Sequence, residues 1–304
     1  MRFDLNLKQL KVFYFVAKNL SFTRAAEELF ISQPAVTMQI SSLEKQYGLR
    51  LFSRQKNELS LTEAGKVLFT YAEKIIGLAF EAERALFNLK DNPQGLLRVG
   101  TTKTITRYWL TPYILRFQQA SPQVKLQLDE GSSEEMALSL LYGRNDIAIV
   151  GRHRYREHLN AFPFPAHAID PLVLVVPPGH ELAGRREVAL EEIVEEPLIL
   201  REKGSGTRYM IQNLLEEANA HPNVLLEAGN VDFIKDLVSR GAGVSIVSAI
   251  SVADEVARGE LCAIPIAGNP SLHIDIVVPE GVHQTEALRS FLDFLMEEGV
   301  DFQG

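Results

Sequence analysis

The apolar residues at the start of the chain repeat at the spacing of a helix. They follow one another in steps of three, which places them on one helix face: Leu7, Leu10, Phe13 and Val16. The segment 19–21 interrupts this pattern, and Ser21 is suited to cap a short helix over residues 22–29. The pattern therefore predicts two helices before residue 30.

A third helix is predicted to begin after Ser32 and to run to about Gln46. Ser32 is a candidate N-cap, and Pro34 falls in the first turn, where its missing N–H costs little. The inward face of this helix is apolar: Val36, Ile40 and Leu43. Two short strands, 51–54 and 59–61, then surround a polar tip. Together these segments predict a helix-turn-helix with a β-wing.

A long helix is predicted after Thr62, because only Gly77 interrupts residues 66–91. At 1.5 Å per residue, a helix of about 28 residues would be roughly 42 Å long. Its apolar residues alternate in steps of four and three, as in a coiled coil: Leu68, Ala72, Ile75, Ala79, Ala82, Leu86 and Leu89. A helix packed on its own domain also carries an apolar stripe. The length of the seam favours a contact between two copies of the helix.

After a linker at 91–95, predicted strands and helices alternate to the end of the chain. The strands cover 96–100, 124–130, 146–151, 171–176, 197–200, 223–227, 244–247 and 274–278. The helices cover 105–119, 134–142, 207–218, 231–240, 252–258 and 286–297. Such alternation predicts a parallel α/β sheet.

Composition places limits on these predictions. A chain of 304 residues is too long for one ordinary domain. No run of about 18 apolar residues and no apolar leader occur, so we expect a cytoplasmic protein without a membrane partner. Cys262 is the only cysteine, which excludes an intrachain disulfide and favours a small buried residue over a redox switch.

Charge is distributed unevenly along the chain. The net charge is −8, but residues 1–60 carry +4 and the remainder carries −12. A basic head on an acidic body indicates that one small module binds phosphate locally.

The candidate DNA contacts lie in this basic head. A helix-turn-helix places the N-terminal residues of its second helix against base edges in the major groove. Gln33 can bond adenine, Thr37 a base or phosphate, and Pro34 and Ala35 can contact a thymine methyl. The full set is Thr23, Arg24, Ser32, Gln33, Pro34, Ala35, Thr37, Met38 and Arg54. Each of them can also be simply an exposed residue of a small helical domain.

The stretches 21–29 and 32–44 resemble the second and third helices of the LysR-type transcriptional regulators. Residues 51–54 and 59–65 resemble the wing and the start of the linker helix of that family. The likeness is strong over the first 65 residues and mainly architectural afterwards. It implies a homodimer, usually assembled into a tetramer, that binds a palindromic promoter site, with RNA polymerase as a further candidate partner.

The resemblance also implies an effector domain of two Rossmann-like lobes similar to periplasmic binding proteins. The expected fold is therefore α/β with an N-terminal all-α winged helix-turn-helix. We expect the DNA-binding domain at 1–61 and the linker helix at 62–91. Lobe I would cover 95–164 and 267–304, and lobe II would cover 165–266.

In a two-lobed domain the effector binds between the lobes, where strands end and helices begin. Hydroxyls and backbone N–H groups at such places suit a carboxylate or an oxyanion. The candidates are Thr101, Thr102, Ser132, Ser133, Gly151, Gly204, Ser205 and Thr207. The alternative is that the Ser and Thr residues only cap helices.

We find no sequence pattern that predicts a cofactor site, a metal site or a catalytic site. The segments starting at Gly204 and Gly241 lack the third glycine of a dinucleotide fingerprint. The histidines lack metal-ligand spacing, and no catalytic set is evident. We therefore expect a regulator, activator or repressor, with no cofactor, no metal and no enzymatic activity. The rival hypothesis is a small-molecule binding protein or enzyme with an N-terminal assembly domain.

Overall fold

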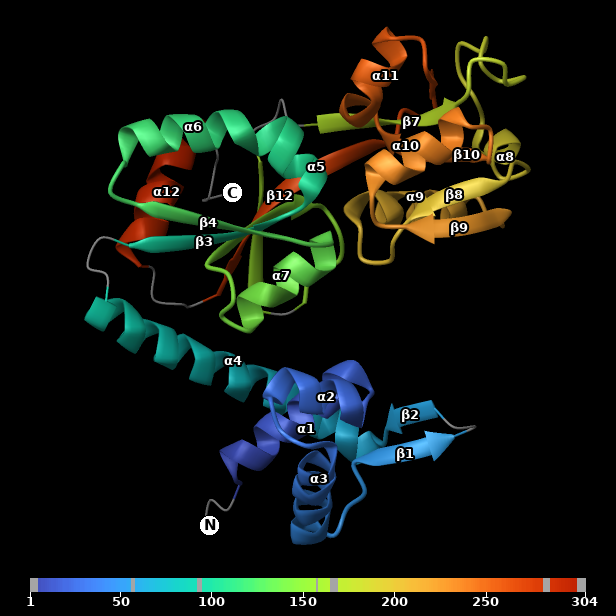
Figure 1. Cartoon of the computed structure of the whole chain (residues 1–304). Coiled ribbons are helices and arrows are strands. Elements are labelled where there is room, and N and C mark those ends of the chain that lie inside the picture. The colour runs from blue at the N-terminus through green and yellow to red at the C-terminus, as the bar shows by residue number, and fades with distance from the viewer. Residues whose placement is uncertain are drawn as a thin grey trace. The chain divides into compact units, whose positions relative to one another are not determined.

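The computed structural model describes residues 5–55, 58–91, 95–156, 158–164, 169–280 and 285–299 (Figure 1). The chain divides into two compact units, residues 1–90 with 141–143 and residues 91–140 with 144–304. No helix in the described ranges is both long and apolar enough to cross a membrane. The domain and lobe boundaries expected above stay predictions.

The first unit contains the predicted helix-turn-helix and wing. Its elements are α1 (Leu7–Asn19), α2 (Phe22–Leu29), α3 (Gln33–Tyr47), β1 (Phe52–Gln55), β2 (Glu58–Leu61) and α4 (Glu63–Asp91). Ser21 and Ser32 cap α2 and α3 as predicted. The helices bury the predicted apolar faces, except that Leu7 in the first turn of α1 is half exposed. The wing is an antiparallel pair in which Arg54 lies opposite Leu59.

Helix α4 orients its apolar residues differently from the predicted seam. Its Phe69 ring stacks on Tyr14 of α1 at 5.9 Å, and Ala72 and Ile76 on the same side are buried. Among the side chains of α4 that the structure describes, the exposed large apolar ones are Val67 (60%), Tyr71 (60%) and Leu78 (64%). Ala72, a residue of the predicted seam, is thus buried and faces the interior of its own unit.

The other seam residues differ in exposure. Leu68 and Ile75 are partly buried, and Ala79 and Ala82 are exposed. The side chains of Leu86 and Leu89 lie outside the described residues. The exposed apolar face of α4 is thus rotated from the predicted seam towards Tyr71 and Leu78.

Lobe I is built on strands β3 (Leu96–Thr101), β4 (Lys125–Glu130), β5 (Ile147–Gly151), β6 (Leu159–Pro163) and β12 (Ser271–Pro279). Its helices are α5 (Lys103–Ile105), the π-turn η1 (Thr106–Leu110), α6 (Thr111–Ala120), α7 (Ser133–Leu141) and α12 (Glu286–Glu297). The strand order is β4-β3-β5-β12, with β6 also paired to β12. Helices α6 and α7 lie on opposite sides of this sheet (Figure 1).

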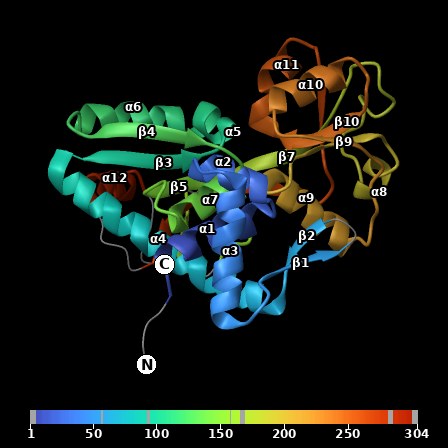
Figure 2. The ribbon, with the colours of Figure 1, turned by 60° about the horizontal axis from the view of Figure 1, so that its bottom comes forward.

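Lobe II is built on strands β7 (Ile169–Val176), β8 (Leu198–Arg201), β9 (Val224–Ala228), β10 (Val244–Ser248) and β11 (Cys262–Pro265). Its helices are α8 (Leu190–Ile193), α9 (Gly206–Glu217), α10 (Val231–Ser239), the 3₁₀ turn η2 (Ala249–Val252) and α11 (Ala253–Ala257). The strand order is β7-β10-β8-β9, with β11 also paired to β7. Figure 2 shows α9 on one side of this sheet and α10 on the other, and each side has its own apolar core.

The prediction of a parallel sheet holds for only part of each lobe. β3 is parallel to β4 and β5, and β8 is parallel to β9 and β10. β12 runs antiparallel to β5, β6 and β7, while β7 runs antiparallel to β10 and β11. The two lobes are joined where β7 and β12 pair, with Asp170 opposite Leu272.

Candidate DNA-binding and effector-binding sites

The N-terminal part of α3 presents the predicted DNA contacts to solvent. Ser32, Gln33, Pro34, Thr37 and Met38 are exposed, and Ala35 is partly so. Thr23 and Arg24, in the first turn of α2, are exposed as well. The backbone of Arg54 lies in the wing, but its side chain is outside the described residues. The candidate contacts of α2 and α3 are thus accessible to solvent on one small domain.

Gln33 and Thr37 form a pair one helical turn apart. The Gln33 side-chain amide donates a hydrogen bond to Thr37 Oγ1 at 2.9 Å, and the Thr37 hydroxyl donates to the backbone carbonyl of Gln33 at 3.2 Å. This pairing orients the Gln33 amide in the free protein. The side-chain carbonyl oxygen of Gln33 and the second N–H of its amide remain available for the two hydrogen bonds that adenine offers.

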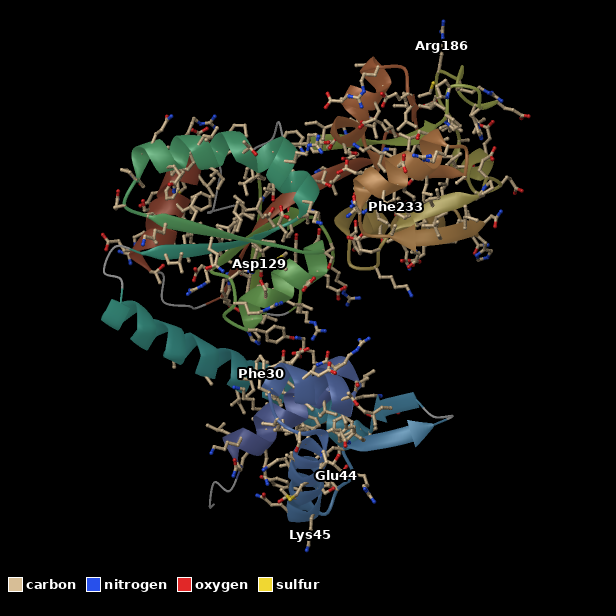
Figure 3. All side chains as sticks on the ribbon, viewed as in Figure 1. Phe30, Glu44, Lys45, Asp129, Arg186 and Phe233 are labelled. Atoms are coloured by element: carbon tan, nitrogen blue, oxygen red, sulfur yellow. The ribbon has the colours of Figure 1, made fainter. Side chains whose placement is uncertain are left out.

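Glu44 fixes the wing to the recognition helix, a role that the sequence analysis missed. Its carboxylate accepts the N–H of Leu51 at 2.7 Å and of Phe52 at 3.4 Å. It also accepts a hydrogen bond from Arg50 at 3.2 Å. Figure 3 shows Glu44 on α3, with Lys45 beside it projecting from the helix. Because these partners follow α3 in the chain, only the fold reveals the contact.

A cleft of about 340 Å³ opens between the lobes. Lobe I lines it with the turns that follow β3 and β4, and lobe II with the ends of β8 and β9 and the start of α10. The lining residues are Thr102, Lys103, Thr104, Arg107, Tyr108, Glu130, Gly131, Ser132, Arg201, Glu202, Gly229, Asn230, Val231 and Asp232. This is where strands end and helices begin, as expected for such a site.

A smaller hollow of about 20 Å³ shares Thr102, Thr104 and Arg201 with the cleft. The rest of its wall comprises Ile105, Ser133, Gly151, Ser205, Gly206, Thr207 and Leu272. Five hydroxyl side chains and one guanidinium therefore surround a space about the size of a single polar group. The donors of this hollow are suited to one carboxylate or phosphate group.

The structure places most of the predicted effector residues in these two spaces. Thr102 and Ser132 line the cleft and also cap their helices. Capping a helix therefore does not prevent these hydroxyls from facing the cleft. Ser205 lines the hollow and caps its helix in the same way. Thr101 and Gly204 line neither space. Thr101 is fully buried in β3, and the carbonyl of Gly204 accepts the N–H of Glu134 at 2.9 Å.

Gly151 and Ser133 serve the contact between the lobes. The Ser133 hydroxyl accepts the N–H of Gly206 at 3.2 Å across the interface. A Cβ added to Gly206 would lie 2.7 Å from the carbonyl carbon of Gly151, so the two backbones meet closely. Because no side chain fits between them, glycine is required at this point.

The charged residues of the cleft were missed by the sequence analysis. Lys103, Arg107 and Arg201 bring positive charge, whereas Glu130, Glu202 and Asp232 bring negative charge. Arg107 lies 3.7 Å from Asp232 across the lobes. The Lys235 ammonium, which donates to Asp232 at 2.9 Å, lowers the pKa of that carboxyl group. Charged residues are too frequent on surfaces for sequence position alone to have identified these.

Comparison with known proteins assigns both parts of the chain to one family. Residues 7–66 match the model of the lysR family of bacterial regulatory helix-turn-helix proteins. Residues 90–299 match the LysR substrate binding domain. The chain belongs to the LysR family. Its recognition helix and its cleft thus occupy the two parts that define a LysR-type regulator.

Named LysR-type relatives match almost the whole chain. It is 34% identical to the HTH-type transcriptional regulator CfxR of Cupriavidus necator, over 99% of this chain and 94% of that protein. It is 31% identical to the HTH-type transcriptional activator CmpR of Synechocystis, over 96% and 95%. Relatives of this kind are transcriptional regulators.

Solved structures show the same architecture. The regulatory domain of CcmR from Synechocystis, solved in complex with 2-PG, is 29% identical with a TM-score of 0.60. That match covers 67% of this chain and 97% of the domain. HinK, a LysR family transcriptional regulator from Pseudomonas aeruginosa, matches 97% of this chain and 99% of its own at a TM-score of 0.58. At 24% identity, HinK supports the fold alone.

Proposed function

We propose that this LysR-type regulator binds a palindromic promoter site through paired recognition helices and responds to a small anion bound between its lobes. The observation that carries the effector part is the hollow where hydroxyls from both lobes converge beside Arg201. The related CcmR domain with 2-PG supports a phosphorylated or carboxylated ligand of similar size. A cytoplasmic location and the absence of enzymatic activity complete the proposal.

Base recognition is assigned to Gln33, Thr37, Pro34 and Ala35, with backbone contacts from Thr23, Arg24 and Arg54. The test is the Gln33→Ala variant, measured against a set of single base changes in the promoter site. We expect a loss of about 1–3 kcal/mol that disappears when one specific base pair is changed. An equal loss on every sequence would contradict base recognition by Gln33.

Self-association is assigned to two separate surfaces. One is the exposed face of α4 with Val67, Tyr71 and Leu78. The other is formed by the outer strands of the lobes, where Leu128 on β4 and Leu225 on β9 are exposed. Phe233 on α10 is exposed as well (Figure 3). Two independent apolar surfaces support a tetramer built from dimers.

The effector site is tested by ligand-induced stabilisation. Because a ligand stabilises the state that it binds, 2-PG or inorganic phosphate should raise the unfolding temperature of the wild type. Thr102→Val and Ser205→Ala should reduce this shift, and Ser239→Ala on α10, outside both spaces, should leave it unchanged. An equal shift in all four proteins would contradict the site. Turnover of the ligand would instead favour an enzyme.

A further inference from the structure

Arg201 is held by a carboxylate of the chain itself at the place where an anionic ligand would bind. It is the last residue of β8, and its side chain is 11% exposed. Its Nε and one terminal nitrogen donate to the two oxygens of Glu202 at 2.8 and 3.0 Å. This two-bond geometry is the one in which a guanidinium binds carboxylate and phosphate ligands.

Glu202 can leave this pair without disturbing the backbone. Its N–H donates to the carbonyl of Ala228, and its carbonyl accepts the N–H of Ser205. The main chain is thus fixed, while the carboxylate is partly exposed and can be rehydrated in the cleft. Only side-chain torsions need to change for the two oxygens to move away from Arg201.

A second cation of the cleft, Arg107, also lies near a carboxylate of the chain, but at a longer distance. Arg107 lies near Asp232, whereas Lys103 has no ion-pair partner within the described ranges. Asp232 is shared between Arg107 and Lys235, so Arg201 is the cation of the cleft that a carboxylate of the chain holds by two hydrogen bonds.

We propose that Glu202 is an internal competitor that occupies Arg201 in the ligand-free protein and sets the affinity of the cleft for anions. This proposal rests on the effector site proposed above. A ligand must replace two charge-assisted hydrogen bonds and then tolerate a nearby carboxylate. A single carboxylate gains too little from Arg201 to do so. The favoured ligand therefore has a second anionic or hydroxyl group that bonds to the hydroxyls of the hollow.

A positioning role for Glu202 would change the ligand affinity in the opposite direction. If Glu202 instead positions Arg201 for the ligand, removing its charge weakens binding. Glu202→Gln separates these roles, because it keeps the size of the side chain and removes its charge. Glu260→Gln is a matched control, since Glu260 pairs with Arg258 by two bonds of the same lengths, 2.8 and 3.0 Å, away from the cleft.

The experiment titrates the full-length wild type, E202Q and E260Q with 2-PG and with inorganic phosphate at constant ionic strength. Fluorescence of Trp109, the only tryptophan, reports binding and calorimetry verifies it. We expect E202Q to bind both probes about 3- to 10-fold more tightly, as for the loss of one competing charged pair, with E260Q unchanged.

Each other outcome contradicts the proposal in a recognisable way. Weaker binding by E202Q assigns it a positioning role, and unchanged binding assigns it no role. Equal tightening in E260Q indicates a general charge effect. Binding that Thr102→Val and Arg201→Ala leave unaffected contradicts the effector site itself, and so does the absence of binding by every protein.

Discussion

The Glu44 carboxylate on the recognition helix accepts the backbone N–H of Leu51, at the start of the wing, at 2.7 Å. Glu44 is largely buried, and the same group also accepts the N–H of Phe52. One side chain therefore fixes the angle between the helix placed in the major groove and the strands that reach the DNA backbone. Such an angle determines whether both elements can contact one duplex together.

Glu44→Ala should weaken promoter binding by releasing the wing while α3 stays folded. If the wing loses one phosphate contact, the slope of log K against log salt should fall by about one. Binding measured across a salt series tests this. Glu44→Gln, which retains an acceptor for Leu51, should stay near the wild-type slope. Weaker binding of Glu44→Ala with an unchanged slope would contradict the coupling.

Tyr71→Asp and Leu78→Asp should each weaken the proposed self-association through α4, because both side chains lie on the exposed apolar face of this helix. A charge placed there would have to be buried at the interface, at a cost of several kcal/mol. Sedimentation measures the outcome. Ala79→Asp, on the seam that the spacing predicted, should have a weaker effect. A stronger effect for Ala79→Asp would restore the predicted seam.

Asp170→Asn should stabilise the protein at neutral pH relative to the wild type. Burial raises the pKa of Asp170 in the folded chain, although its Oδ1 accepts the N–H of Ile250 at 3.2 Å. The folded state therefore binds a proton on the Asp170 carboxyl group more tightly than the unfolded state does. Stability falls as pH rises from the ordinary Asp pKa of about 3.9 to the raised value, and the loss persists above it.

Thermal unfolding at neutral pH and near the ordinary Asp pKa measures this difference. The advantage of Asp170→Asn should disappear as the pH falls, because the wild-type carboxyl is then neutral in both states. Asp254→Asn, at an exposed position on α11, controls for the loss of one charge. An advantage independent of pH would contradict the role of burial.

Gly206→Ala should destabilise the second unit by about 1–3 kcal/mol, as expected for a side chain forced into a filled space. The new Cβ would meet the backbone of Gly151, which cannot turn away as a side chain can. The variant should also bind 2-PG less tightly. Gly184→Ala is the control, since a Cβ there has nothing within 4 Å. Equal unfolding temperatures for the two variants would contradict this prediction.

Local patterns predicted the helices well, because caps and apolar spacing are local. The C-terminal helix 286–297 has the predicted limits, and α3 differs by one residue. Strands β6 and β11 and helix α8 were missed, since each is short and without clear periodicity. The antiparallel course of β7 and β12 was not predictable from alternation, because these strands are about a hundred residues apart and pair only in the folded chain.

The residues of the candidate sites also divide into those that a local sequence pattern reveals and those that only the fold reveals. Hydroxyls such as Thr102 and Ser205 were found because they follow a strand and precede a helix. Arg201 was missed because charged residues are common on surfaces, and Glu44 because its partners lie beyond its own helix. Roles that depend on which segments meet in space leave no local pattern in the sequence.

The contact between Gly151 and Gly206 limits how the lobes can move. With no side chain between the two backbones, the lobes cannot approach further at this point, and separation there would break the hydrogen bond from Gly206 to Ser133. A fixed point of this kind turns closure into a rotation. If the proposed ligand moves the lobes, a small tilt at the glycines would become a larger displacement at the outer strands.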